Sequence, residues 1–249
     1  DQPAQNAEFT YDPQTLVVSK FVPDHPATVL DQAQVKSQTL ETLDTLLGNS
    51  ETPPTNTSQF ALPVSEEPAA VTLGETNELG IKEIIGFGES WYDHSIPARI
   101  HNVALTARKL NNTLLAPGAE FRFNTSLGDV STETEYKAAY IIQNGQTILA
   151  PGGGVCQVSS TLFRALLDAG LQITKRLPHS YRVSYYEINN EPGFDATVYS
   201  GNIDLRFVND TDHYILLNLS TDSENLYMNV KIYGTSDGRS TEIINYRKW

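Results

Sequence analysis

Apolar residues recur at two spacings along the chain, and the spacings predict helices mixed with short strands. One helical face is formed by Val155, Val158, Leu162, Leu166 and Ala169. Gly170 follows as a typical helix stop. The same spacing predicts helices over 28–47 and 96–110. We therefore expect a central helix that starts at Cys156.

Short apolar runs between turn residues predict many strands. The expected strands cover 16–22, 60–64, 81–87, 114–123 with a turn inside it, 138–142, 146–150, 173–176, 182–186, 196–199, 203–208, 214–220 and 226–233. Asn144-Gly145 is a strong signal for a two-residue hairpin. Few helices and many short strands give an α+β class, in which a mostly antiparallel sheet packs against the central helix.

Two stretches lack any such pattern and divide the chain. Residues 49–58 are rich in Pro, Thr, Asn and Ser, which predicts a loop, and residues 66–80 are acidic and irregular. We expect a small α+β N-terminal domain with its linker over 1–78 and a second domain over 79–249.

The charge balance excludes several classes of partner. Lys and Arg number 17 against 30 Asp and Glu, so the net charge is −13. Such a chain is poorly suited to bind nucleic acid or anionic lipid. No run of about 20 apolar residues is present that could span a membrane. Because the chain opens on Asp1 without Met or a signal peptide, we expect a trimmed ectodomain without membrane contact, whose full-length form could carry an anchor.

The chain has a single cysteine, and it lies in an unusual place. One cysteine excludes an intramolecular disulfide and any multi-cysteine zinc site, and no other spacing suggests a metal, so we expect no cofactor. Gly152-Gly153-Gly154 lead into the helix that carries Cys156. A helix N-terminus favours an anion and therefore a thiolate. The alternative is that Cys156 is a small core residue.

A histidine and an acid follow the cysteine. His179 and Asp195 each precede a predicted strand, and Asp204 is a second acid that could orient the histidine. The order Cys, His, Asp suits a nucleophile with its base and orienting carboxylate. The alternatives are a structural histidine and a turn aspartate.

Other polar residues near the cysteine could bind substrate. The glycine run could form an anion nest for a carboxylate or an oxyanion, or it could simply turn the chain into the helix. Arg99, at the start of the expected helix 96–110, could bind a carboxylate through two hydrogen bonds, or it could form a structural salt bridge. The candidate substrate-binding residues are Gly152, Gly153, Gly154, Gln157, Arg99 and Asn102.

Seven motifs in order resemble one family. Residues 79–234 resemble the VanW domain, named for a protein encoded in some vancomycin-resistance clusters. The matching segments are Arg99-x-x-Asn102, 117–124, 152–159, 169–171, Pro178-His179-Ser180, 195–198 and 204–209. Residues 1–78 resemble the tail of the peptidoglycan-binding domain that often precedes VanW domains. One departure is Glu135, where the family usually has glycine before the tyrosine.

The resemblance implies a bacterial cell-surface protein connected with the envelope, but it does not imply an activity. The leading hypothesis is a thiol acyl-transfer enzyme (an amidase, peptidase or transpeptidase) that acts on cell-wall peptide, with Cys156 as nucleophile, His179 as base and Asp195 orienting His179. The order also resembles that of papain and transglutaminase-like enzymes. The alternatives are a non-catalytic peptidoglycan-binding module and a purely structural surface domain.

Overall fold

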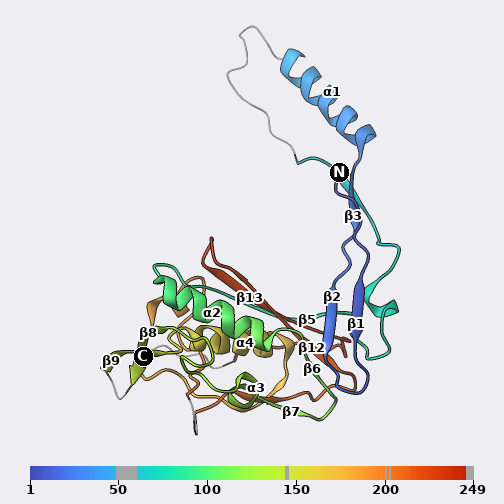
Figure 1. The fold of residues 1–249 in the computed structure, drawn as a ribbon. Helices are drawn as coiled ribbons and strands as arrows, with labels where there is room; N and C mark the ends of the chain where they lie inside the picture. The colour runs from blue at the N-terminus through green and yellow to red at the C-terminus, as the bar shows by residue number, and fades with distance from the viewer. Residues whose placement is uncertain (49–60, 144–145, 200, 202, 245–249) are drawn as a thin grey trace. The chain divides into compact units, whose positions relative to one another are not determined.

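The structure is a computed structural model that describes residues 1–48, 61–143, 146–199, 201 and 203–244. The chain divides into two compact units (Figure 1). One unit comprises residues 1–9 and 20–76, and the other comprises residues 10–19 and 77–249. The break at 76/77 lies close to the break expected at 78/79.

The N-terminal strands form two small antiparallel pairs. β1 (Glu8–Tyr11) pairs with β2 (Val18–Val22), and β3 (Ala27–Leu30) pairs with β4 (Val64–Glu67). α1 (Gln32–Gly48) begins after Asp31, whose carboxylate accepts the Gln34 N–H at 2.9 Å, and η1 (Leu73–Glu75) is a short 3-10 turn.

Two expectations for this region were wrong. Residues 28–30 are strand rather than helix, because their backbone pairs with β4. The second strand forms at 64–67 rather than 60–64. The predicted loop at 49–58 lies outside the described residues.

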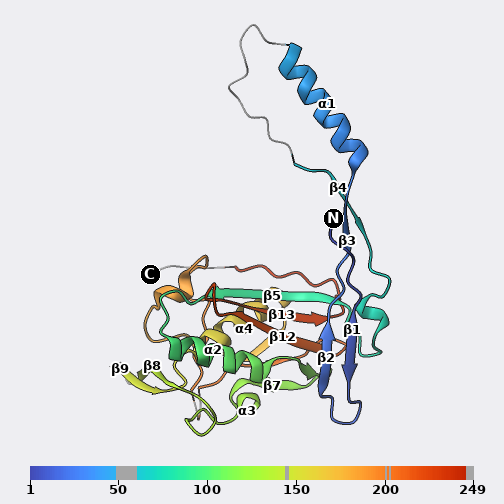
Figure 2. The same cartoon turned by 45° about the horizontal axis from the view of Figure 1, so that its top comes forward.

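The larger unit is built on a four-stranded antiparallel sheet. Its order is β5 (Glu83–Trp91), β13 (Tyr227–Gly234), β12 (Ile215–Asp222) and β6 (Thr113–Leu115). α4 (Val155–Ala169) packs on β5 and β13, and α2 (Pro97–Leu110) packs on β12 and on α4 (Figure 2). A Cβ at Gly88 would lie 2.4 Å from the Thr161 carbonyl oxygen, so glycine is what lets α4 approach β5 so closely.

Smaller elements complete this unit. β10 (Gln172–Lys175), β11 (Arg206–Val208) and β7 (Glu120–Arg122) form a second antiparallel sheet, and β8 (Ala138–Gln143) pairs with β9 (Gln146–Pro151). α3 (Phe123–Leu127) follows β7 directly. The predicted α+β class is confirmed, and the central helix begins at Val155, one residue before the expected start. The turn between β8 and β9 lies outside the described residues.

The stretch between β10 and β11 differs most from expectation. Residues 182–186 do not form a strand, since Ser184–Glu187 is the 3-10 turn η2. Residues 196–199 form only an isolated bridge between Tyr199 and Ile203. Instead of joining a sheet, several backbone carbonyls here accept hydrogen bonds from side chains of α4 and of Arg176. In the part of the chain that is described, no helix is long and apolar enough to cross a membrane.

Candidate active site

Cys156 lies in the first turn of α4, which directly follows the loop of three glycines. Gly152 and Gly154 have φ of 90° and 114°, the left-handed region that glycine adopts without strain. The backbone N–H groups of a first helical turn have no partner within the helix, and Cys156 lies in that turn. The Cys156 side chain is partly buried against the core, and its Sγ lies 3.4 Å from the Val198 carbonyl oxygen.

The structure brings His179 and Asp195 to this thiol. The His179 Nδ1 lies 2.6 Å from the Asp195 Oδ2, and the His179 backbone N–H donates to the same oxygen at 2.7 Å. Both side chains are 12% exposed. This double contact fixes the ring, and Cys156 is a further hydrogen-bond partner of the His179 side chain.

The protonation of His179 depends on both neighbours. Burial lowers the pKa of the imidazole, but hydrogen bonds to Asp195 and to Cys156, together with the negative charges of these groups, raise it to about 9. Burial also raises the pKa of Asp195, and the hydrogen bonds from His179 and the charge of Arg176 outweigh this, so the Asp195 pKa is lowered. Near neutral pH the pair is therefore an imidazolium and a carboxylate.

The other candidate acid has different partners. Asp204 accepts the Asn124 N–H at 3.0 Å and pairs with Arg206 at 2.9 Å. Asp195 is thus the carboxylate that contacts His179.

Two arginines hold the segment that carries Asp195. The Arg176 Nε donates to the Asp195 carbonyl at 2.7 Å, and its Nη2 lies 3.4 Å from the Asp195 Oδ1. Arg164, on α4, is only 7% exposed and donates to the carbonyls of Phe194 at 2.9 Å, Glu89 at 2.7 Å and Tyr186. The Tyr186 ring lies on the imidazole of His179, with centroids 4.9 Å apart.

Two serines of α4 tie the same segment to the helix. The Ser159 Oγ donates to the Ala196 carbonyl at 2.6 Å, and the Ala196 N–H donates to the Ser160 Oγ at 3.0 Å. These hydroxyls therefore fix the residue next to Asp195 relative to the helix that carries Cys156.

The predicted substrate-binding side chains have partners inside the protein. Arg99 donates to the Gln157 Oε1 at 2.8 Å, and Gln157 donates to the Ser90 Oγ at 2.7 Å. Asn102 donates to the Gly153 carbonyl at 3.0 Å. All of these side chains are buried.

The glycine loop itself is tightly packed. A Cβ at Gly153 would lie 2.7 Å from both Ala139 Cβ and the Tyr140 carbonyl oxygen. These contacts support Gly152, Gly153 and Gly154 as a turn that positions Cys156. Contact of the three glycines and of Gln157, Arg99 and Asn102 with substrate stays a prediction.

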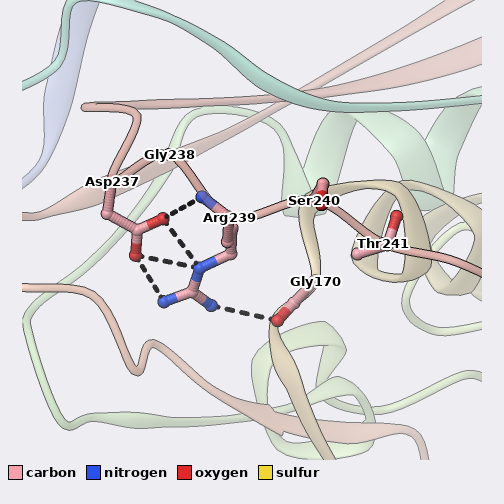
Figure 3. Close-up of a pocket in the computed structure, with 6 residues that line it drawn as sticks. All are labelled: Gly170, Asp237, Gly238, Arg239, Ser240 and Thr241. Atoms are coloured by element: carbon pink, nitrogen blue, oxygen red, sulfur yellow. Dashed lines mark hydrogen bonds and ion pairs between the residues drawn. The ribbon is translucent and has the colours of Figure 1, made fainter.

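Two concave surfaces lie in the larger unit. A cavity of about 120 Å³ adjoins His179 and Asp195. A larger, open concavity of about 540 Å³ lies between Gly170 and residues 237–241, where Arg239 donates to the Gly170 carbonyl at 3.0 Å (Figure 3). Within the described ranges, no cluster of three or more His, Cys, Asp or Glu could hold a metal ion.

The sequence patterns missed Arg164, Arg176 and Tyr186. One signal was available: Arg164 stands between Phe163 and Ala165, in the helix expected to be central to the fold. A cation in such a helix must find acceptors inside the protein, because burying an unpaired charge is costly.

Comparisons with known proteins place the site in a family context. The family described as VanW like protein matches residues 98–231, more than half of the chain, and this range contains Cys156, His179 and Asp195. A protein of Bacillus subtilis (strain 168), "Uncharacterized protein YoaR", is 41% identical over 128 residues. The "Vancomycin B-type resistance protein VanW" of Enterococcus faecalis (strain ATCC 700802 / V583) is 30% identical over 169 residues.

The coverage of these relatives is partial. The matches take in 51% and 67% of this chain, but only 41% of the first relative and 60% of the second. No solved structure matches the chain.

Proposed function

Because the chain belongs to the VanW-like family and holds an imidazolium–carboxylate pair against a thiol, we propose that it is a cell-envelope enzyme of thiol-dependent acyl transfer. Its substrates would be cell-wall peptides, and its reaction that of an amidase, peptidase or transpeptidase. The observation that carries the proposal is the 2.6 Å contact between His179 and Asp195, on an imidazole that also has Cys156 as a hydrogen-bond partner.

The first half of the reaction follows from the geometry. The Cys156 sulfur attacks the carbonyl carbon of an amide, and the negative charge moves to the carbonyl oxygen. The Cys156 backbone N–H, in the first turn of α4, is a donor for that oxyanion. When the C–N bond breaks, protonated His179 gives its proton to the leaving amine, and a thioester on Cys156 remains.

The second half regenerates the Cys156 thiolate and protonated His179. A water molecule or an acceptor amine attacks the thioester carbonyl, and His179 takes the proton that the attacking group loses. The C–S bond then breaks and the sulfur leaves. Asp195 keeps the ring oriented and stabilises its charged form in both halves.

The place of action is part of the proposal. A relative is named for vancomycin resistance, a property of the bacterial envelope, which supports an extracellular or envelope location and a cell-wall peptide as partner. The N-terminal unit would then be the tail of a peptidoglycan-binding domain that holds the catalytic unit near its substrate.

The test combines peptidoglycan fragments with mass spectrometry. We expect the wild type to release products and to accumulate a thioester adduct on Cys156, while Cys156→Ser retains fragment binding and loses processing, because a hydroxyl yields almost no anion near pH 7. Cys156→Ala controls for packing. If both variants behave like the wild type, the domain is a binding or structural module instead.

A matched pair of acids tests the role of the carboxylate. Asp195→Asn should slow alkylation of Cys156 by iodoacetamide and any turnover, whereas Asp204→Asn removes another arginine-paired carboxylate that does not meet His179. Equal rates in the two variants would remove Asp195 from the mechanism.

A further inference from the structure

A cavity of about 120 Å³ lies beside the imidazole of the candidate site. His179 and Asp195 line it, together with the side chains that flank them in the 178–195 segment, whereas Cys156 does not. The cavity is therefore reached from the side of the base rather than from the side of the nucleophile.

That position decides which part of a substrate would enter the cavity. In acyl transfer the acyl group is bonded to sulfur, while the amine departs from the carbonyl toward the protonated imidazole. A side chain in a cavity next to His179 thus belongs to the residue that carries the leaving amine. We infer that this cavity is a subsite for a small uncharged side chain on that residue; the inference rests on the proposed function.

The walls explain the preference for an uncharged group. Much of the lining is apolar or aromatic, from Val183, Tyr186 and Phe194. The charged groups in the lining already have opposite charges as partners. The Arg182 guanidinium forms two hydrogen bonds to the Glu187 carboxylate, at 2.8 and 2.6 Å. A charged ligand side chain would lose hydration here without gaining a dedicated partner.

The volume explains the preference for a small group. At about 30 Å³ per water molecule, the cavity has room for about four waters, which is close to the size of a branched aliphatic side chain. Sites that enclose whole drug-sized ligands are larger, at about 300–1,000 Å³. An indole ring would therefore require the walls to move.

The walls are held in place before any ligand arrives. Arg164 is buried and donates to the carbonyls of both Phe194 and Tyr186, two of the residues that line the cavity. The Arg176 Nη2 donates to the Gly193 carbonyl at 2.5 Å. Such fixed walls favour selection by size, because a rigid pocket cannot repack around a larger group.

The experiment separates the two halves of the reaction. The intact chain is acylated with the phenyl thioester of N-acetylglycine, and adduct formation is followed by mass spectrometry. The amides of alanine, valine, tryptophan and aspartate are then supplied as acceptors. An acceptor amine occupies the place of the leaving amine, so the ratio of aminolysis to hydrolysis reports on the subsite.

We expect the alanine and valine amides to be used at least tenfold better than the tryptophan and aspartate amides. Val183→Phe should fill the cavity and abolish the advantage of the valine amide over glycinamide. Val183→Ala should enlarge it and improve use of the leucine amide.

Two different failures are distinguishable. An acyl-enzyme that reacts equally with all acceptors, or with unchanged preference in both Val183 variants, overturns the subsite and leaves acyl transfer standing. If no adduct forms on Cys156 although iodoacetamide modifies it, both the proposed function and the subsite are overturned.

Discussion

The two sides of the candidate site are held in place by different kinds of interaction. The cysteine side consists of the loop 152–154 and the first turn of α4, and there the backbone itself packs closely. The loop lies against β8, and the Asn102 side chain donates to the Gly153 carbonyl. On the histidine side, the chain has little regular structure, and Arg164 and Arg176 donate to its carbonyls.

The difference shows two ways to position a reactive group. A helix terminus supplies a fixed position that depends on van der Waals packing. An irregular segment needs donors for its buried carbonyls, and a guanidinium with five N–H groups can serve several at once. On the histidine side, removal of an arginine should therefore lower the free energy of unfolding the most. On the cysteine side, addition of a Cβ to a glycine should have the largest effect.

The largest effect is expected for Arg164→Met. This change leaves the carbonyls of Phe194, Glu89 and Tyr186 without their donor, which should lower the free energy of unfolding by about 4 kcal/mol. Urea unfolding measures the loss. Arg182→Met removes an arginine from the same segment, but its side chain is 73% exposed and the change should cost less than about 1 kcal/mol. Similar losses in the two variants would contradict the role assigned to Arg164.

The second prediction concerns pH. The pKa of His179 is about 9 in the folded protein, against a usual value of 6.5. Because the folded value is raised, the stabilisation from His179 is complete below about pH 6.5 and disappears as the pH rises through about 9. The wild type should lose on the order of 3 kcal/mol relative to His179→Gln between these limits.

Asp195 determines how this stabilisation is lost at low pH. Its folded pKa is lowered below 3.8, so its contribution is present above pH 3.8 and is lost as the pH falls through the folded value. Thermal unfolding across the pH range measures both limits. In Asp195→Asn, the loss of stability between about pH 6.5 and about pH 9 should be much smaller than in the wild type. A loss of unchanged size would show that Asp195 does not raise the pKa of His179.

The third prediction compares two glycines, one on each side of the site. Gly153→Ala should destabilise by about 3 kcal/mol, because the new Cβ meets the Tyr140 carbonyl oxygen and Ala139 at 2.7 Å. Gly193 has open space but a φ of 90°, so Gly193→Ala should cost only about 1 kcal/mol of backbone strain. Calorimetry of both variants tests the contrast, which fails if Gly193→Ala is the more harmful.

The same contrast explains how far the sequence could predict the structure. The structure of the cysteine side could be predicted from local sequence patterns. The apolar spacing of 155–169 predicts α4, and Gly152 to Gly154 predict a tight turn before it. The VanW resemblance, carried by short motifs, is confirmed by the family match over 98–231.

The histidine side could not be predicted in the same way. Residues 182–186 and 196–199 have strand-like composition, but the carbonyls of Tyr186 and Ala196 accept hydrogen bonds from side chains of α4 rather than from another strand. Such long-range side-chain contacts leave no periodic trace in the sequence. The order of Cys156, His179 and Asp195 suggested their meeting, and only the structure gives the ring its 2.6 Å contact.

The smallest expected effect is a gain in stability on the cysteine side. Glu135 has a φ of 72°, the left-handed region that costs a residue with a Cβ about 1–2 kcal/mol. This is the position where VanW domains usually have glycine. Glu135→Gly should stabilise the protein by about 0.5–1 kcal/mol, the strain relieved minus the added entropy of an unfolded glycine.

A second variant separates backbone strain from the loss of the glutamate side chain. Glu135→Ala removes the same exposed carboxylate but keeps a Cβ, so it should give no gain, while the His101 ring remains 2.9 Å from the residue 135 carbonyl in both variants. Thermal melts at one pH compare the three proteins. If alanine stabilises as much as glycine, the cause is the acidic charge in a chain of net charge −13 rather than the backbone conformation. If glycine alone stabilises, the cause is backbone strain at residue 135.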